Sequence, residues 1–319
     1  MANLINIIFS TSFGYAVLRV TTPILFATLG ALISIKAGVV NISMEGTMLV
    51  AALTGVAVSA ATGSAFWGLI GAVVAGMLLG LMLAYFALNL KTDIILAAIA
   101  INLMASGGTV FGLFVISGDR GISSSLASRV LPRVQIPLLH QVPVLGSVLS
   151  NHNVLTYVAL LSVVFVYILL YKTPLGLRIR AVGENEHAAD SVGISVIKTQ
   201  YIALIMSGAF AGFGGAFMSM GYVSWFSTNM TAGRGFIALA AEALGMGKPF
   251  GVLLTSLLFG SADALANALQ AFQIPSEFVQ MVPYIVTILG LVIYARRQQS
   301  VASKKGLAPP DKTKMEGSV

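Results

Sequence analysis

Long apolar runs separated by short polar breaks fill most of the chain. Continuous apolar segments of about 20 residues are long enough to cross the ~30 Å hydrocarbon core of a bilayer as helices. Unbroken runs, as opposed to alternating ones, favour helices over barrel strands, because every backbone amide in lipid must find a partner within its own segment. The pattern therefore predicts an all-α fold, a polytopic transmembrane helical bundle of about 8–10 spans.

Nine segments carry this prediction, at 20–36, 44–62, 65–88, 93–116, 153–171, 201–222, 236–247, 250–270 and 279–295. A tenth candidate, 4–18, ends at Arg19 and is short enough to be an interfacial helix instead. The segment 236–247 is too short for a straight crossing and carries Glu242, which favours a broken or re-entrant helix. We expect a transmembrane domain over 1–295 and a basic tail over 296–319.

Composition agrees with a membrane protein. Hydrophobic residues make up 57% of the 319 residues, only 9% are charged, and the mean hydropathy is +0.92; a soluble domain has about 25% charged residues. The chain has no cysteine, which excludes disulfides and thiolate metal sites. No two of its histidines, His140, His152 and His187, have the spacing of helical metal ligands, so no metal site is expected and all three should be solvated.

The basic residues predict an orientation in the cell membrane. Lysine and arginine beside spans are retained on the cytoplasmic side. If the polar break 172–198 is cytoplasmic, the alternation of spans places every lysine there, including those of the C-terminal tail. Only Arg19, Arg120, Arg129, Arg133 and Arg234 then lie outside. The net charge of +7 is thus explained by anchoring to anionic membrane lipid rather than by nucleic acid.

Polar residues within or beside spans are candidates for a translocation path, because a buried charge in a bilayer costs at least ~2.5 kcal/mol. Glu242 and Asp263 look deep, and Asp263 is expected to bond Asn267 one turn later. Glu45 begins a helix, where the dipole of its own N-terminus is the more ordinary explanation for a carboxylate. Packing or structural bonding stays open for these polar candidates, which are Asn41, Glu45, Asn102, Asn229, Glu242 and Asp263. Phe210 is a further candidate, because Phe210, Phe213 and Phe217 share a helix face that could stack on a planar solute or simply pack.

The chain lacks the motifs of catalysis. There is no phosphate-binding loop, no His-Glu-x-x-His and no Gly-x-Ser-x-Gly. We therefore expect a transport subunit rather than an enzyme. An ion-coupled secondary carrier remains an alternative, and a membrane-embedded enzyme is a weaker one.

The polar break 172–198 contains a short helix signal. Asn185 is a competent N-cap, acidic residues fill the first turn, and Gly193 permits a left-handed ending. Ala188, Ala189 and Val192 give this helix a small apolar face. A short charged helix between long apolar spans is suited to docking a soluble partner.

Specific residues in this break resemble a known motif. Ala188-Ala189-x-x-x-Gly193 is similar to the Glu-Ala-Ala-x3-Gly coupling loop of ABC importer permeases, with His187 in place of the glutamate. Further similarity lies in Leu175–Glu184, Asn41–Gly46, Gly233–Ala240 and Leu258–Gly260. Over about residues 20–295 the chain resembles the branched-chain amino acid and simple-sugar permease superfamily, and Asn41–Gly46 looks most like its nucleoside-type branch.

The resemblance implies a set of partners. They are a second homologous permease subunit, a cytoplasmic ATPase that uses ATP and Mg²⁺, and an extracellular solute-binding lipoprotein. This chain itself is expected to bind no cofactor. The implied ATPase-coupling residues are Gly183, Glu184, His187, Ala188, Ala189 and Gly193. Nucleosides are the leading cargo, with simple sugars or other small polar metabolites as the alternative.

Overall fold

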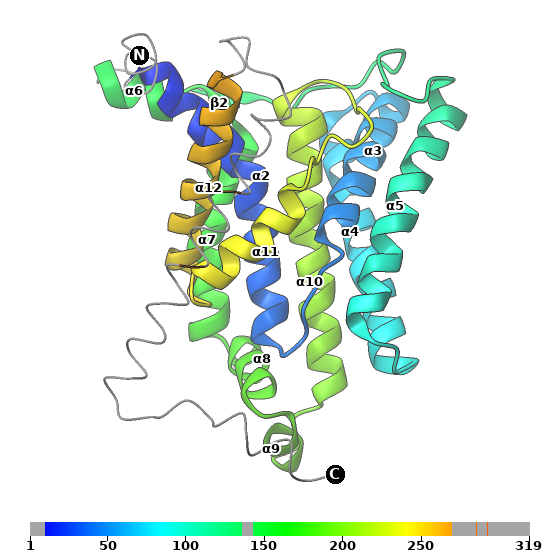
Figure 1. Cartoon of the computed structure of the whole chain (residues 1–319), viewed down its shortest axis with the longest axis vertical. Helices are drawn as coiled ribbons and strands as arrows, with labels where there is room; N and C mark the ends of the chain where they lie inside the picture. Colours follow the sequence, from blue (N-terminus) through cyan, green and yellow to red (C-terminus); the bar gives the residue numbers. More distant parts are fainter. Residues whose placement is uncertain (1–9, 136–142, 270–284, 286–291, 293–319) are drawn as a thin grey trace.

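Seven long helices form the bundle in a computed structural model that describes residues 10–135, 143–269, 285 and 292 (Figure 1). Each is long and apolar enough to cross a membrane. They are α2 (Thr11–Lys36), α3 (Met44–Thr62), α4 (Ala65–Ala84), α5 (Ile94–Ser117), α7 (Val154–Lys172), α10 (Val196–Phe217) and α12 (Pro249–Leu269). The predicted all-α membrane bundle is confirmed. The expected span 279–295 lies almost wholly outside the described residues, and the tail 296–319 lies entirely outside them.

Shorter elements complete the described part of the chain. Two helices end in π-helical turns, α4 in η1 (Tyr85–Asn89) and α10 in η3 (Met218–Tyr222). The short helices are α6 (Pro143–Leu149), α8 (Pro174–Glu184), α9 (Glu186–Ser191) and α11 (Arg234–Leu244). Strands β1 (Arg133–Val134) and β2 (His152–Asn153) pair antiparallel, with Arg133 opposite Asn153. As predicted for the segment near 236–247, α11 is too short to cross: its 11 residues span about 16 Å.

Helix α2 runs through the middle of the bundle, and its residues from Val20 to Ser34 are all buried. The separate segment expected at 4–18 is wrong from Thr11 onward, because these residues are the first turns of α2. Ser10 caps the helix by accepting a hydrogen bond from the amide of Phe13. Arg19 does not end it, since its guanidinium lies 4.6 Å from the centre of the Tyr222 ring and is stabilised there.

Helices α4 and α10 touch along their glycines. A β-carbon on Gly76 would overlap the carbonyl oxygen of Gly208, and one on Gly80 would overlap that of Leu204. The reverse holds for Gly208 against Gly76. Backbones in such close contact gain dispersion energy that side-chain packing in lipid cannot supply. We call the residues Gly76, Gly80, Gly208 and Gly212 the glycine contact.

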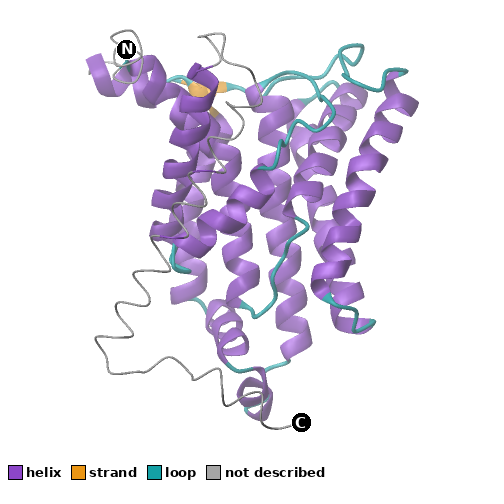
Figure 2. Ribbon diagram, in the orientation of Figure 1, coloured by secondary structure: helices purple, strands orange, loops and turns teal. Residues whose placement is uncertain are grey.

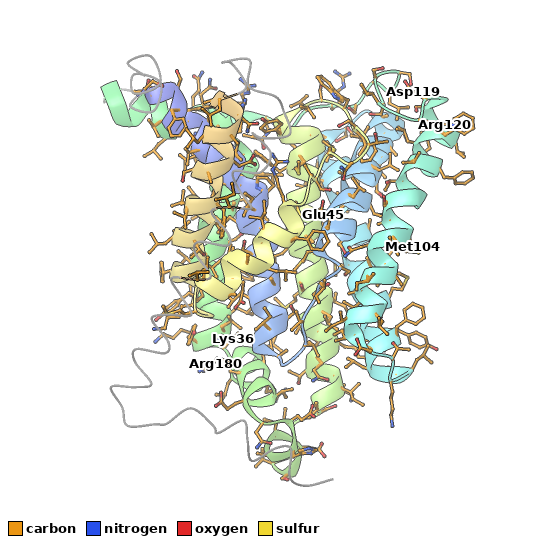
Figure 3. The ribbon with its side chains drawn as sticks, in the orientation of Figure 1. Lys36, Glu45, Met104, Asp119, Arg120 and Arg180 are labelled. Atoms are coloured by element: carbon orange, nitrogen blue, oxygen red, sulfur yellow. The ribbon has the colours of Figure 1, made fainter. Side chains whose placement is uncertain are left out.

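Two connections enter the bundle from opposite ends (Figure 2). Residues 37–43 rise from the end of α2 back into the bundle before α3 begins, and residues 223–233 descend from η3 before α11 begins. Lys36 and Arg180 lie toward the end that carries α8 and α9, whereas Asp119 and Arg120 lie at the opposite end (Figure 3). We refer to these as the α9 end and the Arg120 end.

One of the three histidines departs from the expected solvation. His152 is 1% exposed, stacks on Tyr15 with ring centroids 4.0 Å apart, and shares a hydrogen bond with the carbonyl oxygen of Val148. Burial lowers the pKa of its imidazole from the ordinary value of 6.5. The β1–β2 pairing, which joins residues far apart in sequence, encloses it. His187 is exposed as expected, and His140 lies outside the described residues.

Candidate translocation path and coupling region

The N-termini of α3 and α11 meet inside the bundle at Glu45. Its Oε1 accepts a hydrogen bond from the amide of Gly233 at 2.8 Å, and its Oε2 accepts one from the amide of Gly235 at 2.7 Å. Glu45 stands in the first turn of α3 but caps α11. A helix N-terminus carries about +0.5 elementary charge, so one carboxylate offsets two of them. We call Glu45, Gly233 and Gly235 the Glu45 junction.

Gly235 is required at this junction because a β-carbon there would overlap the amide nitrogen of Glu45. Gly233 has φ +81°, a conformation that favours glycine, and it places both amides toward the carboxylate.

An ion pair fixes the start of α11 to α12. The Nη2 and Nε atoms of Arg234 donate to Oδ2 of Asp263 at 2.8 and 3.0 Å. The expected partner of Asp263, Asn267, is exposed instead. Arg234, which we expect on the outer side of the membrane, is the first residue of α11 and pairs with a residue of α12.

Two predicted path amides hold the 37–43 connection in place. Asn41 is fully buried; its Nδ2 donates to Ser207 on α10, and its Oδ1 accepts from the amide and hydroxyl of Ser43. Asn102 on α5 accepts from the amide of Gly46 and donates to the carbonyl of Ile42. These bonds satisfy backbone groups that an irregular segment leaves unpaired in a bilayer.

The segment 36–45 touches both ends of α11. At one end Glu45 caps its N-terminus. At the other, a β-carbon on Gly247 would come within 2.6 Å of the Lys36 ammonium, and Lys36 is the charged group that acts most on the buried Glu242. A single short stretch of chain thus bonds the N-terminus of α11 and touches the turn that follows its C-terminus.

The two remaining predicted path residues differ in exposure. Phe210 is 7% exposed and packs with Phe26 and Phe213 between α10 and α2, at ring centroid distances of 6.5 Å from each. Asn229 is exposed in the 223–233 connection, has φ +56°, and accepts from the amide of Ala232 in a turn.

The coupling region has the predicted local structure. The side chain of Asn185 accepts from the amide of Ala188 and starts α9, and Gly193 follows with φ +82°. Glu184, His187 and Ala188 are exposed, whereas Ala189 is 3% exposed. Beside α9 lies a hollow of ≈ 310 Å³ lined by Glu186, His187, Asp190, Ser195, Val196 and Ile197.

Helix α8 connects this region to the end of α2. A β-carbon on Gly183 would overlap the carbonyl oxygen of Lys36 and lie 3.0 Å from the amide of Gly38. At its other end α8 begins at Pro174, where Gly176 packs against the backbone of Leu169 on α7. Because these contacts are backbone against backbone, α8 cannot shift far without moving the 36–45 segment.

A cavity of ≈ 170 Å³ lies between α2, η3 and the start of α11, toward the Arg120 end of the bundle. Tyr222 and Trp225 line it with 37% and 42% of their surfaces exposed. Arg234 and Ser227 supply polar groups, and Val20 and Pro23 form its apolar wall.

Sequence reasoning missed the role of Arg234 and the partner of Glu45. The glycines on either side of Arg234 were the available signal, since they mark a backbone position that needs close approach. Within the described ranges 10–135 and 143–269, no cluster of histidine, aspartate and glutamate could hold a metal ion.

The chain is similar to known transporter permeases. Residues 15–291 match the family described as branched-chain amino acid transport system / permease component. The chain is 36% identical over 293 residues to the guanosine ABC transporter permease protein NupQ of Bacillus subtilis, covering 88% of this chain and 91% of that protein. It is 34% identical to the nucleoside ABC transporter permease protein NupC of Lactococcus lactis, covering 86% and 89%.

A further relative carries a different cargo in its name. The putative glucose ABC transporter permease protein TsgC13 of Haloferax volcanii is 35% identical over 254 residues, covering 78% of this chain and 75% of that protein. Among solved structures, PsaBC from Streptococcus pneumoniae in complex with Fab shares the fold, with a TM-score of 0.53 at 14% identity over 91% of this chain and 94% of that chain.

Proposed function

The chain belongs to the permease components of branched-chain amino acid transport systems, and we propose that it forms the membrane path of an ATP-driven importer of nucleosides. The nucleoside cargo is supported by the 36% and 34% identity to permeases named for guanosine and nucleosides. Simple sugars are the second candidate, because a relative named for glucose is 35% identical.

The observation that carries the proposal is the exposed, capped helix α9 joined to the bundle interior by backbone contacts. In this proposal the α9 end is cytoplasmic, where a separate ATPase subunit binds ATP and Mg²⁺ and grips Glu184–Gly193. The positions of the lysines support a cytoplasmic α9 end. Lys172 ends α7 and Lys198 lies in the first turn of α10 at this end, whereas Arg129 and Arg133 lie in the connection after α5 at the other end.

Movement of α9 would pass through α8 to the contact of Gly183 with Lys36. The 36–45 segment would then shift α11, because it bonds the N-terminus of this helix and contacts the turn after its C-terminus. A broken helix with a polar N-terminus inside the membrane is the type of element that lines transport sites. We therefore assign the path to the surroundings of α11, with Glu45, Glu242 and Asp263 as the charged groups beside it.

The remaining partners follow from the family. We propose a second, related permease subunit, since two guanosine permease proteins of B. subtilis, NupQ and NupP, are 36% and 28% identical to this chain. An extracellular solute-binding lipoprotein would deliver cargo to the Arg120 end.

Uptake of labelled guanosine and uridine tests the cargo. Cells that lack this chain should lose uptake, and the wild-type chain should restore it. The exposed Ala188 changed to glutamate should not restore uptake, while Ala127→Glu, an exposed alanine in the connection after α5, should. Unchanged nucleoside uptake in cells without the chain removes the cargo assignment.

Cross-linking tests the docking surface. The chain has no native cysteine, so Ala188→Cys and the control Ala127→Cys each introduce a single thiol. A cysteine-reactive cross-linker should join the ATPase subunit to position 188 and not to position 127. Capture at neither position, with the complex assembled, contradicts docking at α9.

Transport driven by an ion gradient with this chain alone in liposomes would favour a secondary carrier instead.

A further inference from the structure

We propose that the cavity between α2, η3 and α11 is a binding site for the flat heteroaromatic ring of the transported solute, held by Trp225 and Tyr222. The proposal rests on the proposed function for the identity of the solute and adds the site where its ring binds. Among the aromatic residues near α10, Phe210 is buried against α2, whereas Tyr222 and Trp225 line the cavity and keep 37% and 42% of their surfaces exposed.

The size of the cavity limits what it holds. Pockets that enclose a whole drug-sized ligand measure about 300–1,000 Å³, and this cavity measures ≈ 170 Å³. It therefore takes one end of a nucleoside. Because its walls are aromatic and apolar, the end that fits is the planar base, with the hydroxyl-rich sugar left toward the Arg120 end.

Polar groups in the wall favour a ring that carries hydrogen-bond acceptors. A guanidinium has five N–H donors. Among the described residues, Arg234 donates four hydrogen bonds: two to Asp263 and one each to the carbonyls of Met230 and Thr231. One donor remains for a ring carbonyl or ring nitrogen. The hydroxyl of Ser227, which also lines the cavity, can donate or accept.

The charges near the cavity are balanced. Arg234 pairs with Asp263, and Arg19, which lies over Tyr222, is offset by Glu45, whose carboxylate bonds the amides of Gly233 and Gly235 beside Arg234. Both carboxylates are already engaged, so the described residues of the site offer no free anionic group to a cationic solute. The class of ligand is a neutral, planar, acceptor-bearing ring, which is the chemistry of a nucleobase.

The two tryptophans of this chain allow a direct test with a matched control. Trp225 lies at the cavity, while Trp67 lies near the start of α4 with 55% of its surface exposed. In the assembled complex, the fluorescence difference between Trp67→Phe and the double variant Trp67→Phe/Trp225→Phe reports Trp225 alone. The difference between Trp225→Phe and the double variant reports Trp67 alone.

Guanosine should quench the Trp225 signal in a saturable way, and ribose, which has no aromatic ring, should not. The Trp67 signal should respond to neither. Base–aromatic stacking contributes ~1–3 kcal/mol per base, so Trp225→Ala should weaken guanosine binding, measured by equilibrium binding in the absence of the lipoprotein, about 5- to 150-fold. Trp225→Phe should weaken it less, because a ring remains.

The outcomes distinguish failure of the ring-binding site from failure of the nucleoside cargo assignment. If the wild-type complex imports guanosine but the Trp225 signal is unchanged by it, or if Trp225→Phe and Trp225→Ala bind guanosine equally well, the cavity is not the ring site and the inference fails alone. If wild-type cells import no nucleoside, the cargo assignment fails whatever the fluorescence shows. Should Trp225→Ala not assemble, the fluorescence experiment and Trp225→Phe still decide the question.

Discussion

The glycine contact and the Glu45 junction are both places where two helices come unusually close, yet they are held by different forces. At the glycine contact, backbones of α4 and α10 press together with no side chain between them. At the Glu45 junction, two helix ends are joined by a carboxylate through two hydrogen bonds. Dispersion contacts over a long surface resist sliding, whereas a few directional bonds can be exchanged one at a time. The first region is suited to remain fixed while the second moves.

The largest effect is expected when a glycine of the glycine contact is replaced by a larger residue. Gly76→Val should prevent stable folding, with a cost at or above the upper end of the ~1–3 kcal/mol range of overpacking, because backbone atoms and not flexible side chains must move. Thermal unfolding of the purified protein and its yield in membranes measure this. The control is Gly108→Val on α5, where an added β-carbon meets nothing within 4 Å; equal losses in both would refute the proposed rigidity of the contact.

At the Glu45 junction we expect a smaller loss of stability but a large loss of transport. Glu45→Ala leaves the amides of Gly233 and Gly235 without their acceptor and should cost about 1.5–3 kcal/mol. The protein should still assemble, with nucleoside uptake lost and the unfolding midpoint lowered. Asp93→Ala is the matched control, since Asp93 accepts from the amides of Ile95 and Leu96 at the exposed start of its own helix. Normal uptake with Glu45→Ala would remove the junction from the mechanism.

The smallest effect is expected at Ser207, and it sharpens the comparison. Ser207 lies on α10 beside the glycine contact but bonds Asn41 in the 37–43 connection that leads to the Glu45 junction. Ser207→Ala removes the acceptor of the Asn41 amide and should destabilise by about 1 kcal/mol. Uptake should slow without loss of assembled protein. Ser162→Ala is the control, as that hydroxyl donates to the carbonyl of Val158 in its own helix and makes no further hydrogen bond to the described residues. A loss of assembly with Ser207→Ala as severe as with Gly76→Val would show that the two regions are not mechanically distinct.

The comparison also shows which parts of the structure could be predicted from sequence. Apolar runs predicted the long helices, and local signals predicted α9: Asn185 as its cap and Gly193 with positive φ are properties of adjacent residues. The Glu45 junction depends on residues about 190 positions apart, and the Arg234–Asp263 pair on residues 29 apart. A helix start favours any nearby carboxylate, so the sequence indicated that Glu45 faces a helix dipole but not that the dipole belongs to α11.

The balance of charge on α11 has a consequence for energetics under membrane voltage. Moving one elementary charge through the membrane potential changes the free energy by about 2.3 kcal/mol per 100 mV. Between Arg234 and Leu244 the helix carries one positive and one negative side chain, Arg234 and Glu242, and Glu45 offsets the partial charges of the two helix starts. With Glu242 ionised, a displacement of α11 moves no net side-chain charge across the field. Together with a neutral cargo, this makes the import step electrically silent, so its rate should be the same in polarised and depolarised cells.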